Sequence, residues 1–317
     1  MKVSIIIAVK NYNDNLKECL DHCLELDYPD YEIIVVPDWT MVPDDKRIKV
    51  FSSGPNRLPA KKRDMAAEIA EGEILAFLDD DAYPDPGWLT HAVKNFKDTN
   101  IAAVGGPAVT PPGETLYARA SGLVYESFIV TGSFHYRYAK ERRQFVDDYP
   151  SCNLLVRKEV FDKIGGFKTN FWPGEDTYLC LEIVKLNLKI VYDPNVLVYH
   201  HRRTLFLGHL KQIKSYALHR GYFAKRYPET SLRWQYFVPS IFVIYLFLGS
   251  LPPGWWLFYL FFLISYAVIV FVNAFHKNDL KLTWLVFAGI FVSHFTYGIY
   301  FAYGLMKKAL EEEDIDV

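Results

Sequence analysis

The chain has 317 residues, of which 51% are hydrophobic and 16% aromatic, and its formal net charge is −2 at pH 7. This length allows one large domain or two modest ones, and the apolar content excludes an intrinsically disordered chain. Because basic residues are not in excess, the composition gives no support to nucleic acid as a partner.

The N-terminus has the pattern of a strand rather than of a secretion signal. A short apolar run over residues 3–9 follows Lys2 and ends at polar Lys10, and no small-residue cleavage site follows. We therefore expect the N-terminal domain to stay in the cytoplasm. The cysteines agree with that compartment, because they form no CxxC pair and are expected to be reduced thiols: Cys19, Cys23, Cys152 and Cys180.

Strands and helices alternate over residues 1–100. Apolar, β-branched runs predict strands over residues 3–9, 32–36 and 74–78. Helical spacing of apolar residues predicts helices over 15–26 and 59–71, the second with Pro59 at its start and Gly72 after its end. Strands separated by helices predict an α/β fold with a mostly parallel, Rossmann-like sheet, in which ligands bind at the carboxyl ends of the strands.

Composition changes sharply near residue 235. Residues 236–275 contain no charged side chain over a length of about 40 residues, whereas a spanning helix needs roughly 20. Pro252-Pro253-Gly254 interrupts this stretch as a turn between two helices would, and residues 282–306 form a third uncharged stretch. We therefore predict a catalytic domain over 1–230, a membrane domain of two to three helices over 235–306, and an acidic tail over 307–317.

Basic residues predict the orientation in the membrane. They precede the first apolar segment and recur at Lys277 and Lys281, whereas residues 250–254 carry no charge. The rule that basic loops stay inside predicts a multi-pass protein of the cell membrane with its catalytic domain in the cytoplasm. The third segment is long enough to cross, and we favour a crossing. That path would put Lys307 and Lys308 outside, so a bend back or a path along the inner interface stays open.

An acidic cluster, Asp79-Asp80-Asp81, directly follows the predicted strand over residues 74–78. If the backbone stays extended there, Asp79 and Asp81 point to one side and Asp80 to the other. Two carboxylates on one side can hold Mg²⁺ or Mn²⁺ through oxygen. The alternative is a solvated acidic turn. The fully apolar strand before the cluster favours the metal site.

The segment over residues 77–84 resembles the DxD segment of GT-A glycosyltransferases of family 2. Further segments resemble that family's motifs in the family's order: residues 3–11, 32–38 and 60–64, Gly165-Gly166-Phe167, and Glu175-Asp176. Pro37 and Asp64 depart from the motifs, where an Asp and an Asn are expected. The match covers residues 1 to about 225. Residues 132–137 and the C-terminal membrane region are similar to membrane-bound transferases of exopolysaccharide and other envelope-glycan pathways.

The resemblance implies a nucleotide-diphosphate-sugar donor, with donor-binding roles for Asn11, Asp38, Arg63, Asp79 and Asp80. It also implies a metal site at Asp79, Asp81 and His200. Alternatives stay open for three of these residues. Arg63 can pair with an Asp of the metal site instead of the diphosphate, and Asp38 can cap the end of a strand. His200, which follows a predicted strand over residues 190–199, can be structural.

The resemblance implies Asp176 as the catalytic base, with Glu175 beside it. A free Asp is a weak base at neutral pH, with a pKa near 3.9, but burial or a neighbouring negative charge raises it. The alternative is that Asp176 caps a helix, because an apolar-periodic stretch over residues 178–191 follows it.

We therefore predict an inverting, metal-dependent glycosyltransferase that acts on a lipid-linked or glycan acceptor at the membrane. Thr230 stands where a processive synthase would carry the Gln of QxxRW, although Arg233-Trp234 is present, so transfer of one or a few sugars is expected. A nucleotidyltransferase of similar fold would need a Gly-rich loop after the first strand, and residues 10–14 contain no Gly. Asp79, Asp81 and Asp176 argue against an inactive, membrane-tethered glycan-binding protein.

Overall fold

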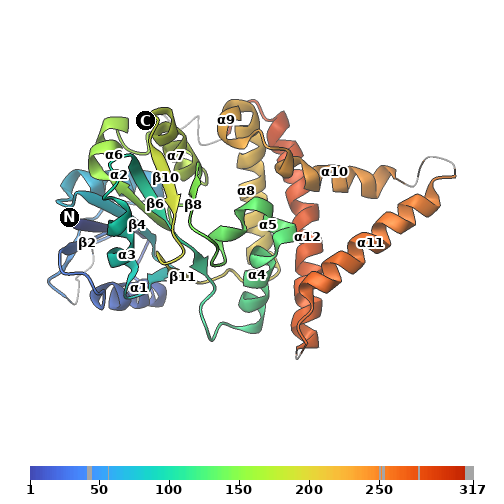
Figure 1. Ribbon diagram of the computed structural model, residues 1–317, viewed down its shortest axis with the longest axis horizontal. Helices are drawn as coiled ribbons and strands as arrows, with labels where there is room; N and C mark the ends of the chain where they lie inside the picture. The colour runs from blue at the N-terminus through green and yellow to red at the C-terminus, as the bar shows by residue number, and fades with distance from the viewer. Residues whose placement is uncertain (41–44, 56, 250, 252–253, 278, 311–317) are drawn as a thin grey trace. The chain divides into compact units, whose positions relative to one another are not determined.

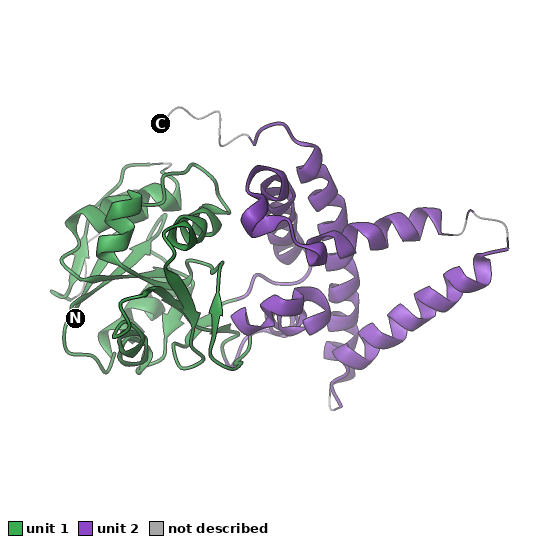
Figure 2. Cartoon of the chain, turned by 45° about the horizontal axis from the view of Figure 1, so that its top comes forward, with its two compact units in different colours: residues 1–111, 139–201, 315–317 green, residues 112–138, 202–314 purple. Residues whose placement is uncertain are grey.

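The chain divides into two compact units (Figure 2). The computed structural model describes all residues except 41–44, 56, 250, 252–253, 278 and 311–317. Apart from residues 311–317, the first unit contains residues 1–111 and 139–201, and the second contains residues 112–138 and those from 202 onward. Residues 112–138, which the chain inserts between two parts of the first unit, therefore belong to the second.

An eight-stranded sheet forms the centre of the first unit, in the order β3-β2-β1-β4-β9-β6-β10-β8. Its strands β1, β2, β3 and β4 are mutually parallel, β6 is parallel to β10, and β9 and β8 run antiparallel to their neighbours. The strands span Val3–Ala8 (β1), Tyr31–Val36 (β2), Ile48–Val50 (β3), Ile74–Asp79 (β4), Ile101–Gly105 (β6), Gln144–Val146 (β8), Asn153–Arg157 (β9) and Lys189–Tyr192 (β10). The predicted α/β fold with a mostly parallel sheet is confirmed.

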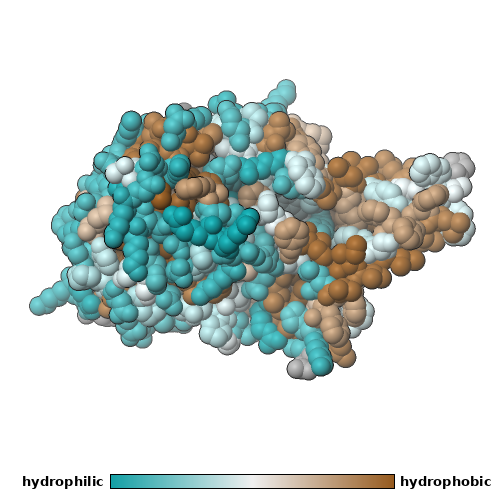
Figure 3. Space-filling model, in the orientation of Figure 1, coloured by the Kyte–Doolittle hydropathy of each residue, from teal (hydrophilic) through white to brown (hydrophobic). Residues whose placement is uncertain are grey.

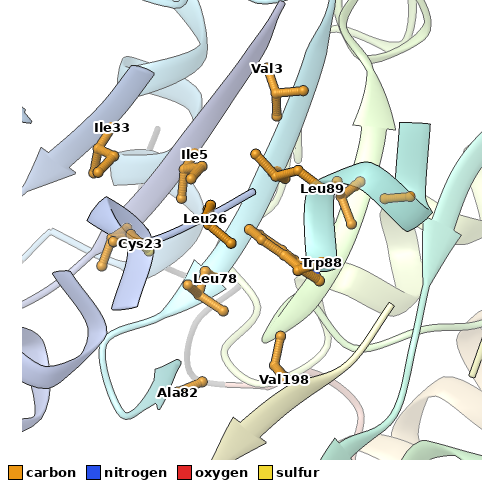
Figure 4. Packing of buried hydrophobic residues seen from close by; sticks show 14 of the residues in the cluster. Val3, Ile5, Cys23, Leu26, Ile33, Leu78, Ala82, Trp88, Leu89 and Val198 are labelled. Atoms are coloured by element: carbon orange, nitrogen blue, oxygen red, sulfur yellow. The ribbon is translucent and has the colours of Figure 1, made fainter. Parts of the chain in front are cut away.

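Five helices belong to this unit: α1 (Asp14–Leu24), α2 (Pro59–Ile69), α3 (Trp88–Asn95), α6 (Lys158–Ile164) and α7 (Glu175–Lys185). They pack on the sheet because their apolar residues recur on one side, as Leu16, Cys19, Leu20 and Cys23 do on α1. Figure 4 shows the core below α1 and α3, with Trp88 lying among Leu26, Leu78 and Val198. All four cysteines are free and buried.

A small second sheet, in the order β5-β11-β7, lies in the same unit: β5 (Ala82–Pro84), β11 (Val198–His200) and β7 (Ala108–Val109). The sequence predicted one strand over residues 190–199 and a helical stretch over 178–191, and both predictions are wrong in part. Helix α7 ends at Lys185, and a turn closed by the Val196 N–H to Asp193 O bond separates β10 from β11. Pro194 has no N–H to donate, which favours that break.

The described residues of the second unit form helices and no strand (Figure 1). They are α4 (Leu116–Glu126), α5 (Phe128–Thr131), the 3₁₀ turn η1 (Gly132–Arg137), α8 (Leu207–Arg226), α9 (Pro228–Ser231), α10 (Trp234–Leu248), α11 (Trp256–Ala274) and α12 (Leu280–Met306). Within the described ranges, α11 and α12 are long and apolar enough to cross a membrane, whereas apolar α10 has 15 residues. The predicted turn at Pro252 and Pro253 lies outside the described residues.

The Gly165-Gly166-Phe167 turn joins α6 to the core. Gly165 ends α6 in the left-handed conformation, and Gly166 follows at φ +83°. A Cβ on Gly166 would lie 2.5 Å from Asp64 Oδ1, the atom that accepts the Phe167 N–H at 2.9 Å. Burial raises the pKa of Asp64 to about 6, although that N–H bond lowers it. Only glycine therefore allows this turn to close on α2.

Gly166→Ala should destabilise the protein through both the positive φ and the clash with Asp64. Gly54→Ala is the matched control, because Gly54 has φ +77° and nothing lies within 4 Å of its added Cβ. The control should lose only the roughly 1–2 kcal/mol of the left-handed conformation, and Gly166→Ala more. Thermal unfolding of both variants in one detergent measures this, and equal losses would contradict the role given to the Asp64 contact.

Candidate active site

The carboxyl ends of three parallel strands bring most of the predicted site residues to one edge of the sheet. Ala8, the last residue of β1, pairs with Val36 of β2 on one side and with Asp79 of β4 on the other. The residues that follow these strands therefore share an edge: Asn11 after β1, Asp38 after β2, and the acidic cluster after β4. Ligands bind at this edge in open α/β sheets.

A group of three possible metal ligands forms at this edge. The ligand atoms of Asp79, Asp81 and His200 all lie within 4.8 Å of one another, and the three side chains are half-buried. The pairing of β5 with β11 sets His200 opposite Ala82, which brings its Nε2 to 3.1 Å from Asp81 Oδ1. Two carboxylates and an imidazole suit Mg²⁺ or Mn²⁺, so these residues fit a divalent cation.

The electrostatics of this group also suit a cation. Burial lowers the pKa of His200, but the charge and the hydrogen bond of Asp81, together with the Cys152 thiol, outweigh burial and raise this pKa to about 10. A positive charge is thus stabilised between these side chains, and a metal ion would take the place of the proton. Burial, and then the charge of Asp81, raises the pKa of Asp80 to about 6. Asp80 is held outside the group, 3.2 Å from Asn13 Nδ2.

Arg63 of α2 connects this group to α7. Its Nη2 lies 2.7 Å from Asp79 Oδ1, and its Nη1 lies 2.8 Å from Glu175 Oε1. The guanidinium is buried over the Phe167 ring, and its Nε has no hydrogen-bond partner among the described residues. The ion-pair alternative for Arg63 is thus the geometry observed, and a contact with the donor stays a prediction.

Glu175 and Asp176 begin α7 after the N-cap Gly174, and their environments differ. Glu175 is buried and held by Arg63 and the Gly174 N–H. Burial, and then the charge of Asp176, raises the pKa of Glu175 to about 7, although Arg63 opposes the rise. Asp176 is half-buried, and its carboxylate accepts the N–H groups of Ser151 and Thr177. The cap itself is Gly174, so Asp176 is not the capping residue.

A buried ion pair lies behind this edge. Asp38 and Lys62 are each only 3% exposed and contact one another directly, and Lys62 Nζ also donates to Val9 O at 2.6 Å. The charge of the Asp38 carboxylate is therefore compensated by Lys62 of α2. Sequence reasoning missed Lys62, although a Lys adjacent to Arg63 on the helix that follows β3 was a usable signal.

Two further polar residues escaped the sequence analysis. Asn13 both caps α1, by accepting the Leu16 N–H at 2.8 Å, and donates to Asp80. The His201 ring Nε2 lies 2.8 Å from Glu18 Oε2, and the His201 backbone N–H donates to Asp81 O at 2.9 Å. The backbone bond fixes the end of β11 against the acidic cluster. Asn11 is exposed at this edge, and its role in donor binding stays a prediction.

Comparison with known proteins identifies the family. The family model described as Glycosyl transferase family 2 matches residues 4–165, which include the acidic cluster and Arg63. The chain belongs to glycosyl transferase family 2. This membership favours glycosyl transfer over the nucleotidyltransferase and the inactive glycan-binding alternatives.

Several curated proteins are similar to this chain. The chain is 28% identical to the O-antigen biosynthesis protein RfbC of Myxococcus xanthus and 26% identical to the pre-mycofactocin glycosyltransferase of Mycobacterium tuberculosis, over 63% and 72% of its length. It spans only 17% and 48% of those two proteins. It is 23% identical to the glucosyl-dolichyl phosphate glucuronosyltransferase of Haloferax volcanii, over 63% of this chain and 69% of that one.

Solved structures agree on the fold. The mannosyltransferase PcManGT of Pyrobaculum calidifontis, solved with GDP-Man and Mn²⁺, superposes with a TM-score of 0.62 at 17% identity. The match covers 94% of this chain and 87% of that one. This likeness and the family match show that the α/β fold of the chain is GT-A.

Lys62→Met should destabilise the protein, because it leaves the Asp38 carboxylate buried without a partner. Removing one partner of a buried pair costs about 3–5 kcal/mol, whereas replacing both is often nearly neutral. Lys62→Met with Asp38→Asn should therefore recover much of the loss. Lys185→Met, which breaks a pair of half-exposed side chains with Glu182, is the control and should cost at most about 1 kcal/mol.

Thermal unfolding checks these variants, with a shift of roughly 2–4 °C expected per kcal/mol for a domain of this size. A double variant no more stable than Lys62→Met alone would contradict the pairing.

Proposed function

We propose that this glycosyltransferase transfers one sugar, with inversion, from a nucleoside-diphosphate-sugar donor to a lipid-linked acceptor at the membrane. The transfer depends on a divalent cation, Mg²⁺ or Mn²⁺. The observation that carries this proposal is the convergence of Asp79, Asp81 and His200 at the carboxyl edge of the sheet. Comparisons support the chemistry, since PcManGT was solved with GDP-Man and Mn²⁺ and the Haloferax relative is named for a dolichyl-phosphate substrate.

Asp79, Asp81 and His200 would hold the cation. A bound cation supplies Lewis-acid stabilisation of the negative charge that develops on the departing nucleoside diphosphate. Arg63 orients Asp79 through its ion pair. Asn11, Asp38 and Asp80 lie along the same edge and are assigned to donor binding. Lys62 limits the role of Asp38, because one carboxylate oxygen is already in an ion pair.

Asp176 is assigned as the base and Glu175 as a positioning residue. An acceptor hydroxyl oxygen bonds to the anomeric carbon as the bond to the diphosphate oxygen breaks, and the hydroxyl proton passes to the Asp176 carboxylate. Asp176 suits this step because it is partly exposed, and backbone N–H groups orient it. Glu175 is buried against Arg63 and keeps that side chain between the metal group and α7.

The membrane attachment is assigned to the apolar helices of the second unit. Large apolar side chains are exposed along α10 and α11, among them Ile241, Phe247, Phe258, Phe261 and Val272, and Figure 3 shows apolar colour over both helices. A single soluble chain rarely exposes so much apolar surface. The basic residues before α10 assign the catalytic unit to the cytoplasmic side.

Asp81→Asn should remove most transferase activity, and chelation of the wild type should do the same. Asp81 is the cleaner test, because Asp79 also pairs with Arg63. Loss of a metal ligand weakens transition-state stabilisation by several kcal/mol. Asp162→Asn, at a more exposed carboxylate on α6, is the control and should keep wild-type activity. Full activity in chelator, with metal shown to be absent, would refute the assignment.

Asp176→Asn should lower kcat by roughly 10²- to 10⁴-fold while leaving donor binding nearly intact, as expected for loss of a general base. Glu182→Gln on the same helix should be neutral. Donor affinity, turnover and the anomeric configuration of the product, followed by NMR, are the measurements. A variant that loses donor affinity but keeps its turnover would show that Asp176 is not the base, and a retained configuration would refute inversion.

A further inference from the structure

Helices α4, α5 and α8 lie along one side of α12 and form polar contacts with it. The α4–α5 segment begins beside its N-terminus, where Arg119 lies 3.2 Å from Asp279, and reaches its middle, where His294 bonds to Ile129 O at 3.1 Å. Helix α8 covers the rest. His209, near its start, bonds to Ser293, and Lys225, near its end, bonds to Leu305 O at 3.3 Å.

The backbones of α8 and α12 approach one another closely. A Cβ on Gly304 would lie 2.1 Å from Leu218 O, and one on Gly221 would lie 2.1 Å from Phe301 O. Because these two glycines have no side chain, the backbones of α8 and α12 can lie close together. The two helices cannot separate without losing this packing. Helix α8 therefore accompanies α12 wherever α12 lies.

Helix α8 is strongly basic, because it carries no acidic residue and five basic ones: Lys211, Lys214, Arg220, Lys225 and Arg226. Lys214 lies over the Tyr300 ring of α12 at 4.9 Å. Where α4, α8 and α12 meet, His209 is fully buried and bridges Ser121 and Ser293 at 2.8 Å each. The middle of α12 therefore meets the hydrogen-bonding His209 and the charged Lys214 of α8, in addition to apolar residues such as Val124 of α4, which shares a core with Ile290.

The opposite side of α12 faces the two apolar helices. Near the C-terminal end, Ser240 of α10 donates to Gly298 O at 2.7 Å. Near the N-terminal end, Val270 and Ala274 of α11 share a core with Leu282 and Val286. Figure 1 shows α10 and α11 leaving α12 on one side, and α4, α5 and α8 on the other. An exposed apolar stripe also runs from one end of α12 to the other: Leu280, Trp284, Phe291, Ile299, Tyr303 and Met306.

We propose that α12 lies along the membrane surface, with both ends on the side of the catalytic unit, and that only the α10–α11 hairpin enters the hydrocarbon. If α12 crossed, its middle would lie at the bilayer centre and carry Lys211 and Lys214 of α8 with it, where charged side chains are strongly disfavoured. When α12 lies in the interface, its exposed apolar stripe faces the lipid and the basic helix α8 faces the water.

The sequence analysis favoured a full crossing of the third segment on its length alone. A full crossing would put Lys307 and Lys308 outside, against the rule that basic residues stay inside. On the interfacial path both lysines stay on the inner side of the membrane. This inference rests on the proposed membrane attachment and identifies the partner of α12 as the surface of the lipid bilayer.

Two variants that each add one cysteine test the path, Lys277→Cys before α12 and Lys308→Cys after it, both at exposed positions. An impermeant maleimide is applied to cells before and after permeabilisation. The four native cysteines are buried, so the wild type in parallel gives the background. Both sites should be labelled only after permeabilisation. Labelling of residue 308 alone in intact cells would overturn the proposal. Labelling of both in intact cells would refute the cytoplasmic orientation while keeping both ends of α12 on one side.

Depth measurement gives an independent test. Nitroxides at Phe291→Cys on the stripe and at Ile264→Cys in the middle of α11 are compared in phospholipid vesicles by power-saturation EPR. The label at 291 should lie about 5–10 Å below the headgroup boundary, and the label at 264 deeper. A label at 291 near the bilayer centre, about 15 Å deep, would overturn the proposal. A shallow label at 264 would refute insertion of the hairpin and with it the inference.

Discussion

The double ion pair of Arg63 joins the carboxyl edge of the sheet to the start of α7 in the first unit. One guanidinium contacts Asp79 at the end of β4 and Glu175 at the start of α7, segments that lie far apart in the sequence. A buried arginine is stable only when its charge is paired, and each carboxylate in turn depends on it. The pair therefore fixes the distance between the metal group and the proposed base. The ion pair also explains why Glu175 is buried beside Asp176, because Arg63 compensates the Glu175 charge. Glu175 therefore needs no contact with the acceptor.

Strong local patterns made much of the first unit predictable. The apolar strands over residues 3–9, 32–36 and 74–78 and the helices beginning near Asp14 and at Pro59 follow directly from periodicity and end signals. The break between β10 and β11 was missed, because apolar and aromatic residues continue on both sides of Pro194. That break matters for the site, since β11 is the strand that brings His200 to Asp81.

Long-range pairing could not be predicted from one sequence. Asp79 and Asp81 were found from their position after a strand, but the approach of His200 depends on the β5–β11 register, and the Lys62–Asp38 pair on how α2 packs against the sheet. For the same reason the sequence left Arg63 with two alternatives of equal standing. In the second unit, hydropathy found the apolar helices, yet the neighbours of α12, which decide its path, come from residues 112–138 and from α8.

The central claim is that Asp79, Asp81 and His200 bind a divalent cation together with the donor diphosphate. The most direct measurement is the affinity for Mn²⁺ in the presence of a nucleoside diphosphate, by EPR of free Mn²⁺ or by calorimetry on the full chain. The account predicts one Mn²⁺ per chain for the wild type. It also predicts affinities lower by at least about tenfold for Asp81→Asn and His200→Gln, and an unchanged affinity for Asp162→Asn. Wild-type affinity in both site variants would contradict it.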